Sequence, residues 1–101
     1  ADTIIGTNTF IDNQVHVAHN VRIGKNCMIA GQVGFAGSCS LGDNVVIGGQ
    51  AGISGHLNIG NNVKIGGGSG VINDIKDNEQ VMGYPAIPLR EFIKQRKKNE
   101  K

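Results

Sequence analysis

Aliphatic and aromatic residues recur at every sixth position along most of the chain. These anchor residues run without an insertion from Ile5 to Val71. They are Ile5, Ile11, Val17, Ile23, Ile29, Phe35, Leu41, Ile47, Ile53, Ile59, Ile65 and Val71. Four positions after each anchor stands a second small or apolar residue, as Val15 follows Ile11. Side chains alternate along a strand. The pattern therefore predicts that this second residue and the next anchor both face inward, and that the residue between these two faces outward.

The six-residue period predicts a parallel β-helix, an all-β fold in which each repeat buries its apolar side only by stacking on its neighbours. We expect four-residue strands, such as residues 15–18, separated by two-residue corners. Glycine and asparagine are frequent at these corners, where φ must be positive. Twelve hexads then make four 18-residue coils of a triangular prism. Residues 18 apart should lie one above another at roughly 4.8 Å.

Stacking the hexads by 18 residues sorts the outward residues into three columns. The first is Phe10, Met28, Val46 and Lys64, the second is His16, Gly34, Gly52 and Gly70, and the third is Arg22, Ser40, Asn58 and Lys76. Only the third column is suited to water. An apolar column beside a glycine column indicates a partner surface, because large exposed apolar patches are rare on monomers. We expect a second copy of the chain there, and a three-sided prism suits a cyclic homotrimer.

One stack of corners holds two of the three histidines. Its pairs are His19-Asn20, Gly37-Ser38, Gly55-His56 and Asn73-Asp74. A histidine at a solvated turn can be a surface residue without a function. The bare glycine backbone stacked above His19 favours a functional site instead, and the spacing leaves both interpretations open.

Composition excludes several classes of protein. Sixteen glycines and four aromatic residues among 101 residues rule out an ordinary globular core. A net charge of +2 gives no reason to expect nucleic-acid binding, and the absence of a long apolar run excludes a transmembrane segment. Cys27 and Cys39 fall at inward positions and should be reduced core thiols of a cytoplasmic protein. The chain also lacks a secretory signal and begins at Ala1 inside the repeat, which suggests a piece of something longer.

Three motifs carry a resemblance to a known family. The run IDNQVHVAHNVRIG, followed by IGGQAGISGHLNIG and a closing GYPAIPL, resembles the UDP-3-O-acylglucosamine N-acyltransferases of lipid A biosynthesis. The wider hexapeptide acyltransferase pattern covers residues 5–76. The resemblance implies a left-handed parallel β-helix, a handedness that the period itself does not show. It also implies a cytoplasmic homotrimer that moves a 3-hydroxyacyl group from acyl carrier protein to the 2-amine of a UDP-sugar. The family's uridine-binding domain, which precedes its β-helix, has no counterpart here.

The resemblance also implies roles for individual residues. His19, the histidine of AHN, is the expected general base, and Gly37 would offer a backbone N–H to the oxyanion. His56 would steady the substrate or the oxyanion. Asp12 lies across a strand from His19, about 13 Å away at 3.3 Å per residue, so it would act on a neighbouring subunit's histidine or merely cap a corner. Phosphopantetheine on acyl carrier protein carries the donor acyl group, and we expect no metal or other cofactor.

The acyl chain needs a narrow apolar place beside the His19 corner. We expect it along the glycine column of Gly34, Gly52 and Gly70, against a neighbour's apolar column with Met28. Gly70 would stand at the far end, where a bulky residue should favour shorter acyl chains. Asn20 completes the expected substrate-binding set, and His16 is assigned to the interface.

Three other functions stay open. A UDP-N-acetylglucosamine O-acyltransferase would share the fold and the donor. A β-helix carbonic anhydrase binds zinc through three histidines between subunits. That family places two of the ligands five residues apart, whereas His16 and His19 are three apart. A non-catalytic scaffold would need nothing special at the His19 corner.

The repeat fails at Asp77, where an anchor should stand. We therefore assign residues 1–76 to the β-helix acyltransferase domain, residues 77–87 to a connecting loop and residues 88–101 to a basic helix that begins at Pro88. One side of this helix carries Arg90, Lys94, Lys97 and Lys98. That side is either a solvated face or a docking surface for acyl carrier protein, whose recognition surface is acidic in the family.

Overall fold

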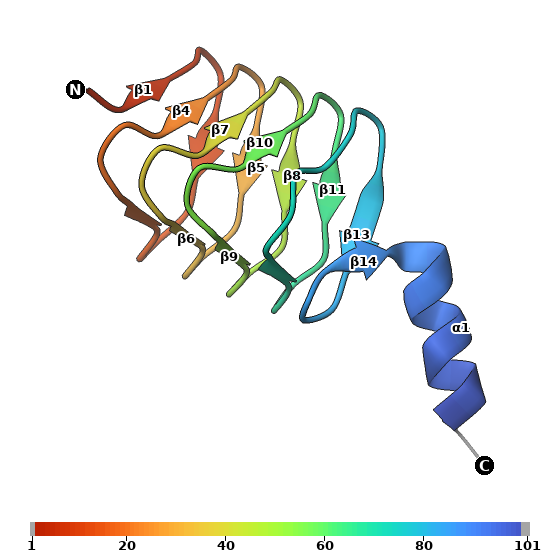
Figure 1. The fold of residues 1–101 in the computed structure, drawn as a ribbon. Coiled ribbons are helices and arrows are strands. Elements are labelled where there is room, and N and C mark those ends of the chain that lie inside the picture. The colour runs from red at the N-terminus through yellow and green to blue at the C-terminus, as the bar shows by residue number, and fades with distance from the viewer. Residues whose placement is uncertain (1, 100–101) are drawn as a thin grey trace.

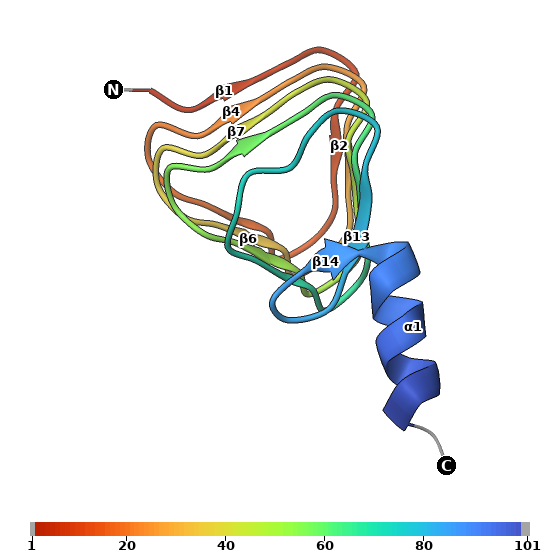
Figure 2. The ribbon, with the colours of Figure 1, turned by 45° about the vertical axis from the view of Figure 1, so that its right-hand side comes forward.

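A computed structural model describes residues 2–99, which form a three-sided parallel β-helix followed by one helix (Figure 1). The view in Figure 2 shows the triangular outline of the coils. The polar face consists of β1 (Ile4–Ile5), β4 (Arg22–Ile23), β7 (Ser40–Leu41) and β10 (Asn58–Ile59). The apolar face begins with β2 (Phe10–Ile11), β5 (Met28–Ile29), β8 (Val46–Ile47) and β11 (Lys64–Ile65). The glycine face consists of β3 (His16–Val17), β6 (Gly34–Phe35), β9 (Gly52–Ile53) and β12 (Gly70–Val71).

The register between coils follows the predicted 18-residue spacing. Met28 pairs with Val46 on the apolar face, and Gly34 pairs with Gly52 on the glycine face. The regular strands are two residues long rather than four, because the chain already turns into the corners on either side. Backbone bonds continue beyond the strands, as where the Ala36 N–H donates to the Ile53 carbonyl at 3.0 Å.

The interior is a column of stacked side chains, as the pattern predicts. Val21 and Ile23 are buried on either side of the exposed Arg22. Phe35 is the largest of the fully buried side chains. Cys27 and Cys39 are both buried free thiols, and burial raises the pKa of Cys39 above its usual value. A narrow core of this kind needs few aromatic residues, which accounts for the composition.

Residues with a left-handed backbone conformation form the corners. The second residue of each corner has a φ near 60°, and asparagine or glutamine occupies most of these positions. The non-glycine examples are Asn8, Gln14, Asn20, Asn26, Gln32, Ser38, Asn44, Gln50, His56, Asn62 and Asn78. Between the apolar and glycine faces the glutamine amides form a ladder. Gln32 Nε2 donates to Gln14 Oε1 at 2.9 Å, and Gln50 Nε2 donates to Gln32 Oε1 at 2.8 Å.

The fourth coil is two residues shorter than the three before it. Ile75 pairs with Ile59, 16 residues earlier, and β13 (Gln80–Met82) pairs with β11 at the same offset. The expected corner Asn73-Asp74 is therefore wrong, and Lys76 does not stack above Asn58. Instead the Asp74 carboxylate accepts a hydrogen bond from the Asn58 N–H at 2.8 Å. The chain crosses inside the corner because Ile75 takes the inward place above Ile59, as Figure 2 shows for the blue-green segment.

Residues 77–87 are more than the connecting loop that the sequence suggested. After β13 the chain turns back, and β14 (Ile87–Pro88) pairs antiparallel with β13. The helix α1 (Leu89–Asn99) begins one residue after Pro88. It projects from the prism, and Arg90 Nη1 lies 3.8 Å from Glu79 Oε2 near its first turn (Figure 1). Residues 100–101 and the side chain of Lys98 lie outside the described part. No helix within the described residues has the length and apolar character to cross a membrane.

Gly24 is expected to be essential for stacking, whereas Gly52 is not. A Cβ on Gly24 would overlap the Gly42 carbonyl oxygen of the next coil, but a Cβ on Gly52 would meet nothing within 4 Å. Because the obstacle is backbone, Gly24→Ala should lower the free energy of unfolding by about 1–3 kcal/mol. The matched control Gly52→Ala should change it by less than about 0.5 kcal/mol. Urea unfolding followed by circular dichroism measures both, and equal losses would contradict the stacking argument.

Candidate active site

His19 lies against Gly37 at the corner between the glycine and polar faces. A Cβ built on Gly37 would stand 3.1 Å from His19 Cε1 and 3.2 Å from His19 Nε2. These distances are shorter than ordinary van der Waals contact, so a side chain on residue 37 would push the imidazole away. The 18-residue spacing thus places a histidine ring over bare backbone one coil along.

The backbone N–H of Gly37 is available to a ligand. At the corner between the polar and apolar faces, the equivalent N–H groups are occupied by side chains from the next coil. The Lys25 N–H donates to Asp43 Oδ1 at 3.0 Å, and the Asp43 N–H donates to Asn61 Oδ1 at 2.7 Å. Gly55, which follows Gly37 in its stack, has no side chain that could do the same. Within residues 2–99, no acceptor is bonded to the Gly37 N–H.

His56 belongs to the same stack of corners as His19 but occupies a different position in its own corner. It occupies the left-handed second place, as Asn20 and Ser38 do, with a φ of 61°. Its N–H donates to the Gly37 carbonyl at 3.1 Å. Two coils separate it from the level of His19, which is roughly 10 Å at the usual strand spacing. His56 therefore flanks Gly37 from the side opposite His19 along the prism axis.

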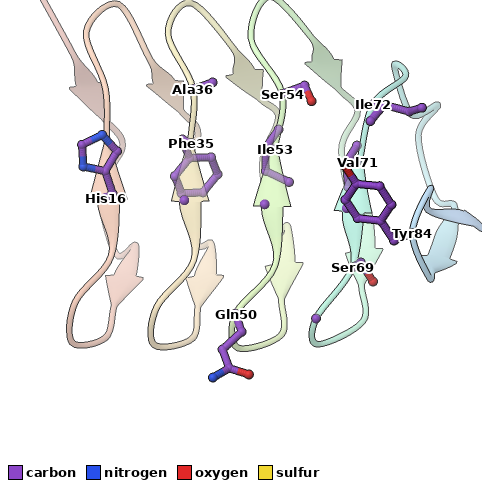
Figure 3. Close-up of a pocket in the computed structure, with 14 residues that line it drawn as sticks. His16, Phe35, Ala36, Gln50, Ile53, Ser54, Ser69, Val71, Ile72 and Tyr84 are labelled. Carbon is purple, nitrogen blue, oxygen red and sulfur yellow. The ribbon is translucent and has the colours of Figure 1, made fainter.

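A groove of about 630 Å³ runs along the glycine face. Figure 3 shows His16 at one end and Tyr84 with Ile72 at the other. The floor is almost free of side chains, because a Cβ on Gly34 or Gly52 would meet nothing within 4 Å. The groove also reaches Ala36, the residue before Gly37. It thus adjoins the His19 corner, which is where the sequence predicted an acyl groove.

Tyr84 closes the far end of this groove. A Cβ on Gly70 would overlap the Tyr84 ring, and Gly70 is held on both sides by the β13–β14 turn. The Gly70 N–H donates to the Gly83 carbonyl at 2.9 Å, and the Ala86 N–H donates to the Gly70 carbonyl at 2.7 Å. Our expectation of an open position at Gly70 therefore needs correction. A bulky residue there would displace Tyr84 rather than simply fill the groove.

Sequence reasoning missed Tyr84 and Ile72. The signal for Tyr84 was its place in the closing GYPAIPL motif, seven residues after the break in the repeat at Asp77. Ile72 stands one place after its anchor Val71, at the outward position that Ala36 and Ser54 occupy in the preceding coils. It is 47% exposed.

Two of the predicted site residues lie away from the His19 corner. The Asp12 carboxylate accepts a hydrogen bond from the Asn13 N–H at 2.7 Å, so it caps its own corner. Met28 is 58% exposed on the apolar face and could reach a groove only from another copy of the chain. In the described part of the chain, no group of three or more His, Cys, Asp or Glu residues gathers as a metal site.

Comparisons with known proteins agree with this architecture. The family model described as bacterial transferase hexapeptide (six repeats) matches residues 2–37. UDP-3-O-acylglucosamine N-acyltransferase of Caulobacter vibrioides (strain NA1000 / CB15N) is 56% identical over 94 residues, which are 93% of this chain. The chain is similar to hexapeptide-repeat transferases. It spans 28% of the length of that relative.

Solved structures of similar transferases share the fold of this chain. UDP-N-acetylglucosamine O-acyltransferase from Moraxella catarrhalis RH4 has a TM-score of 0.81 at 30% identity, over 93% of this chain and 38% of that one. Serine acetyltransferase from Neisseria gonorrhoeae also has a TM-score of 0.81, at 29% identity, over 85% of this chain and 37% of that one. The predicted fold class, a left-handed parallel β-helix of about four coils with a C-terminal helix, is confirmed.

Proposed function

We propose that the protein containing this chain transfers a 3-hydroxyacyl group from acyl carrier protein to the 2-amine of a UDP-3-O-acylglucosamine. The observation that carries the proposal is the His19 ring over the unbonded Gly37 N–H, beside a groove whose floor lacks side chains. The 56% identity to an enzyme of that name supports the choice of substrate.

The chemistry needs a base and an oxyanion donor in one place. In the proposed reaction, His19 Nε2 takes a proton from the substrate amine as the nitrogen attacks the thioester carbonyl carbon. The new C–N bond creates an oxyanion, which accepts a hydrogen bond from the Gly37 N–H. Collapse of this intermediate breaks the C–S bond, and the proton on Nε2 passes to the departing thiolate. His56, beyond Gly37 along the axis, would steady the oxyanion or the sugar.

Acyl transfer to a hydroxyl is the second candidate function. The likeness to UDP-N-acetylglucosamine O-acyltransferase favours it, because the same fold and corner would serve either acceptor. An assay that offers one acyl carrier protein donor with either UDP-3-O-acylglucosamine or UDP-N-acetylglucosamine decides between them. We expect the amine acceptor to be used, and exclusive use of the second acceptor would overturn the N-acyltransferase assignment.

The proposed enzyme works in the cytoplasm as a homotrimer. The outward column of the apolar face exposes Phe10, Met28 and Val46 by 58%, 58% and 40%, which suits burial against another copy. Helix α1 carries Arg90, Lys94 and Lys97 as exposed cations and stands clear of the prism in both ribbon views (Figures 1 and 2). These cations would attract the acidic surface of acyl carrier protein.

The groove predicts how acyl-chain length is selected. Gly52→Met would place a side chain on the open floor, since nothing lies within 4 Å of that Cβ. We expect preference to shift to shorter acyl donors, at about 0.8 kcal/mol for each methylene group that is no longer buried. Competition between acyl carrier protein donors of different length measures the ratio. Gly31→Met, in the corner between the apolar and glycine faces and outside the groove, is the control. Unchanged ratios in a folded Gly52→Met protein would move the acyl chain to another face.

A further inference from the structure

The His19 ring has one hydrogen-bonding partner among residues 2–97, the amide of its neighbour Asn20. Asn20 Nδ2 lies 3.3 Å from His19 Nδ1. Within the same residues, neither His16 nor His56 has a hydrogen-bonded ring. The contact therefore distinguishes the one histidine that lies against Gly37.

The corner holds this amide in place. Asn20 has a φ of 60°, in the left-handed region that asparagine tolerates better than most residues. It is half-buried, and the next residue, Val21, is fully buried in the core. The Ser38 N–H also donates to the His19 carbonyl at 3.0 Å, which fixes the backbone before Asn20. The amide can thus turn about its own bond but cannot move far from the imidazole.

The hydrogen bond at Nδ1 decides where a neutral imidazole carries its proton. If the amide nitrogen donates to Nδ1, the proton sits on Nε2, the ring nitrogen closer to Gly37. If the amide is turned by 180°, Oδ1 accepts from Nδ1–H and Nε2 keeps its lone pair. The two amide ends have almost the same size, so both arrangements fit the corner. Only the second allows Nε2 to take a proton from an amine beside Gly37.

We propose that Asn20 is a positioning residue whose amide oxygen accepts from His19 Nδ1–H during acyl transfer and so directs the Nε2 lone pair towards Gly37. This inference rests on the proposed function. When Nε2 takes the proton of the amine, Nδ1–H stays bonded to Oδ1. The Nε2 proton then passes to the thiolate, and Asn20 neither gains nor loses a proton.

An uncharged partner distinguishes this pair from a histidine–carboxylate pair. Arg22 and Asp2 line a shallow hollow with Asn20 on the polar side of the corner, and His56 lies two coils away. None of the three is hydrogen-bonded to His19 in the described part of the chain. No carboxylate in the described part of the chain duplicates the role of the amide. Removal of the Asn20 amide should therefore lower kcat without compensation from another group.

The test removes the amide while keeping the corner. In the full-length enzyme, Asn20→Gly keeps a backbone that accepts positive φ and should lower kcat about tenfold to a hundredfold, the value of a hydrogen bond to a charged group. Asn44→Gly is the matched control, because Asn44 also has a φ of 60° but lies at the corner between the polar and apolar faces. It should leave kcat unchanged.

Asn20→Asp should rescue turnover with a shifted pH profile. A carboxylate oxygen can accept from Nδ1–H as the amide oxygen does, but its negative charge favours the protonated imidazolium over the neutral ring. Since the base must be neutral to act, the acid limb of kcat should move to higher pH. An unmoved limb would contradict contact between residue 20 and the imidazole.

Nitrogen-15 NMR of the histidine rings gives a readout that does not depend on turnover. The neutral His19 ring should carry its proton on Nδ1 in the wild type, and Asn20→Gly should shift it towards Nε2. An unchanged tautomer, or a wild-type kcat in Asn20→Gly, would overturn the role of Asn20. Loss of activity in a His19 variant alongside a normal Asn20→Gly protein would refute only this inference, whereas a fully active His19 variant would refute the proposed function itself.

Discussion

Replacing His19 with alanine in the full-length enzyme should lower kcat by about 10² to 10⁴, the usual contribution of a general base. Fold and assembly should be unaffected, because the side chain is exposed, with its ring beside Gly37 and the Asn20 amide rather than in the core. The measurement is acyl transfer at saturating acceptor amine, so that weaker binding does not imitate lost chemistry.

Lys25→Ala is a suitable control for this variant. Lys25 occupies the first position of its corner, as His19 does, and it is also exposed. It should retain wild-type turnover. If His19→Ala keeps more than about a tenth of wild-type kcat, His19 is not the base, and another group must take the proton of the amine.

Replacing Met28 with aspartate should dissociate the proposed homotrimer. Met28 stands between Phe10 and Val46 in the outward column of the apolar face, and burying an unpaired carboxylate there should cost several kcal/mol. Sedimentation velocity should show smaller species at concentrations where the wild type is trimeric.

The polar face offers the control for this second change. Ser40→Asp adds the same charge in the middle of that face, beside Arg22 and Asn58. It should leave the assembly intact. A Met28→Asp protein that still sediments as a trimer, or a wild type that is a stable monomer, would exclude the apolar face as the interface.

The fold was predictable because one apolar residue marks each six-residue repeat in the sequence. An inward anchor at every sixth position allows only one stacking in which Val21, Ile23 and Phe35 are all buried, and the structure has it. The contact between His19 and Gly37 follows from the same spacing. The roles given to those residues came instead from the family resemblance, since spacing cannot distinguish a catalytic histidine from one on a solvated turn.

The short fourth coil could not be predicted in the same way. Ile75 keeps the six-residue pattern as an inward residue four places after Val71, so the sequence shows no break there. Only stacking decides that Ile75 lies above Ile59. Tyr84 was missed for a related reason. Its place over Gly70 depends on the β13–β14 turn, a tertiary contact between segments without a shared period.

The antiparallel strand β14 has a consequence for how these molecules behave at high concentration. The last coil of a parallel solenoid presents a row of N–H and carbonyl groups, which can template further strands and lead to fibres. Here the strand next to β13 runs in the opposite direction, is only two residues long and contains Pro88, which has no N–H to offer. Helix α1 follows at once. This end of the solenoid is therefore protected against end-to-end polymerisation.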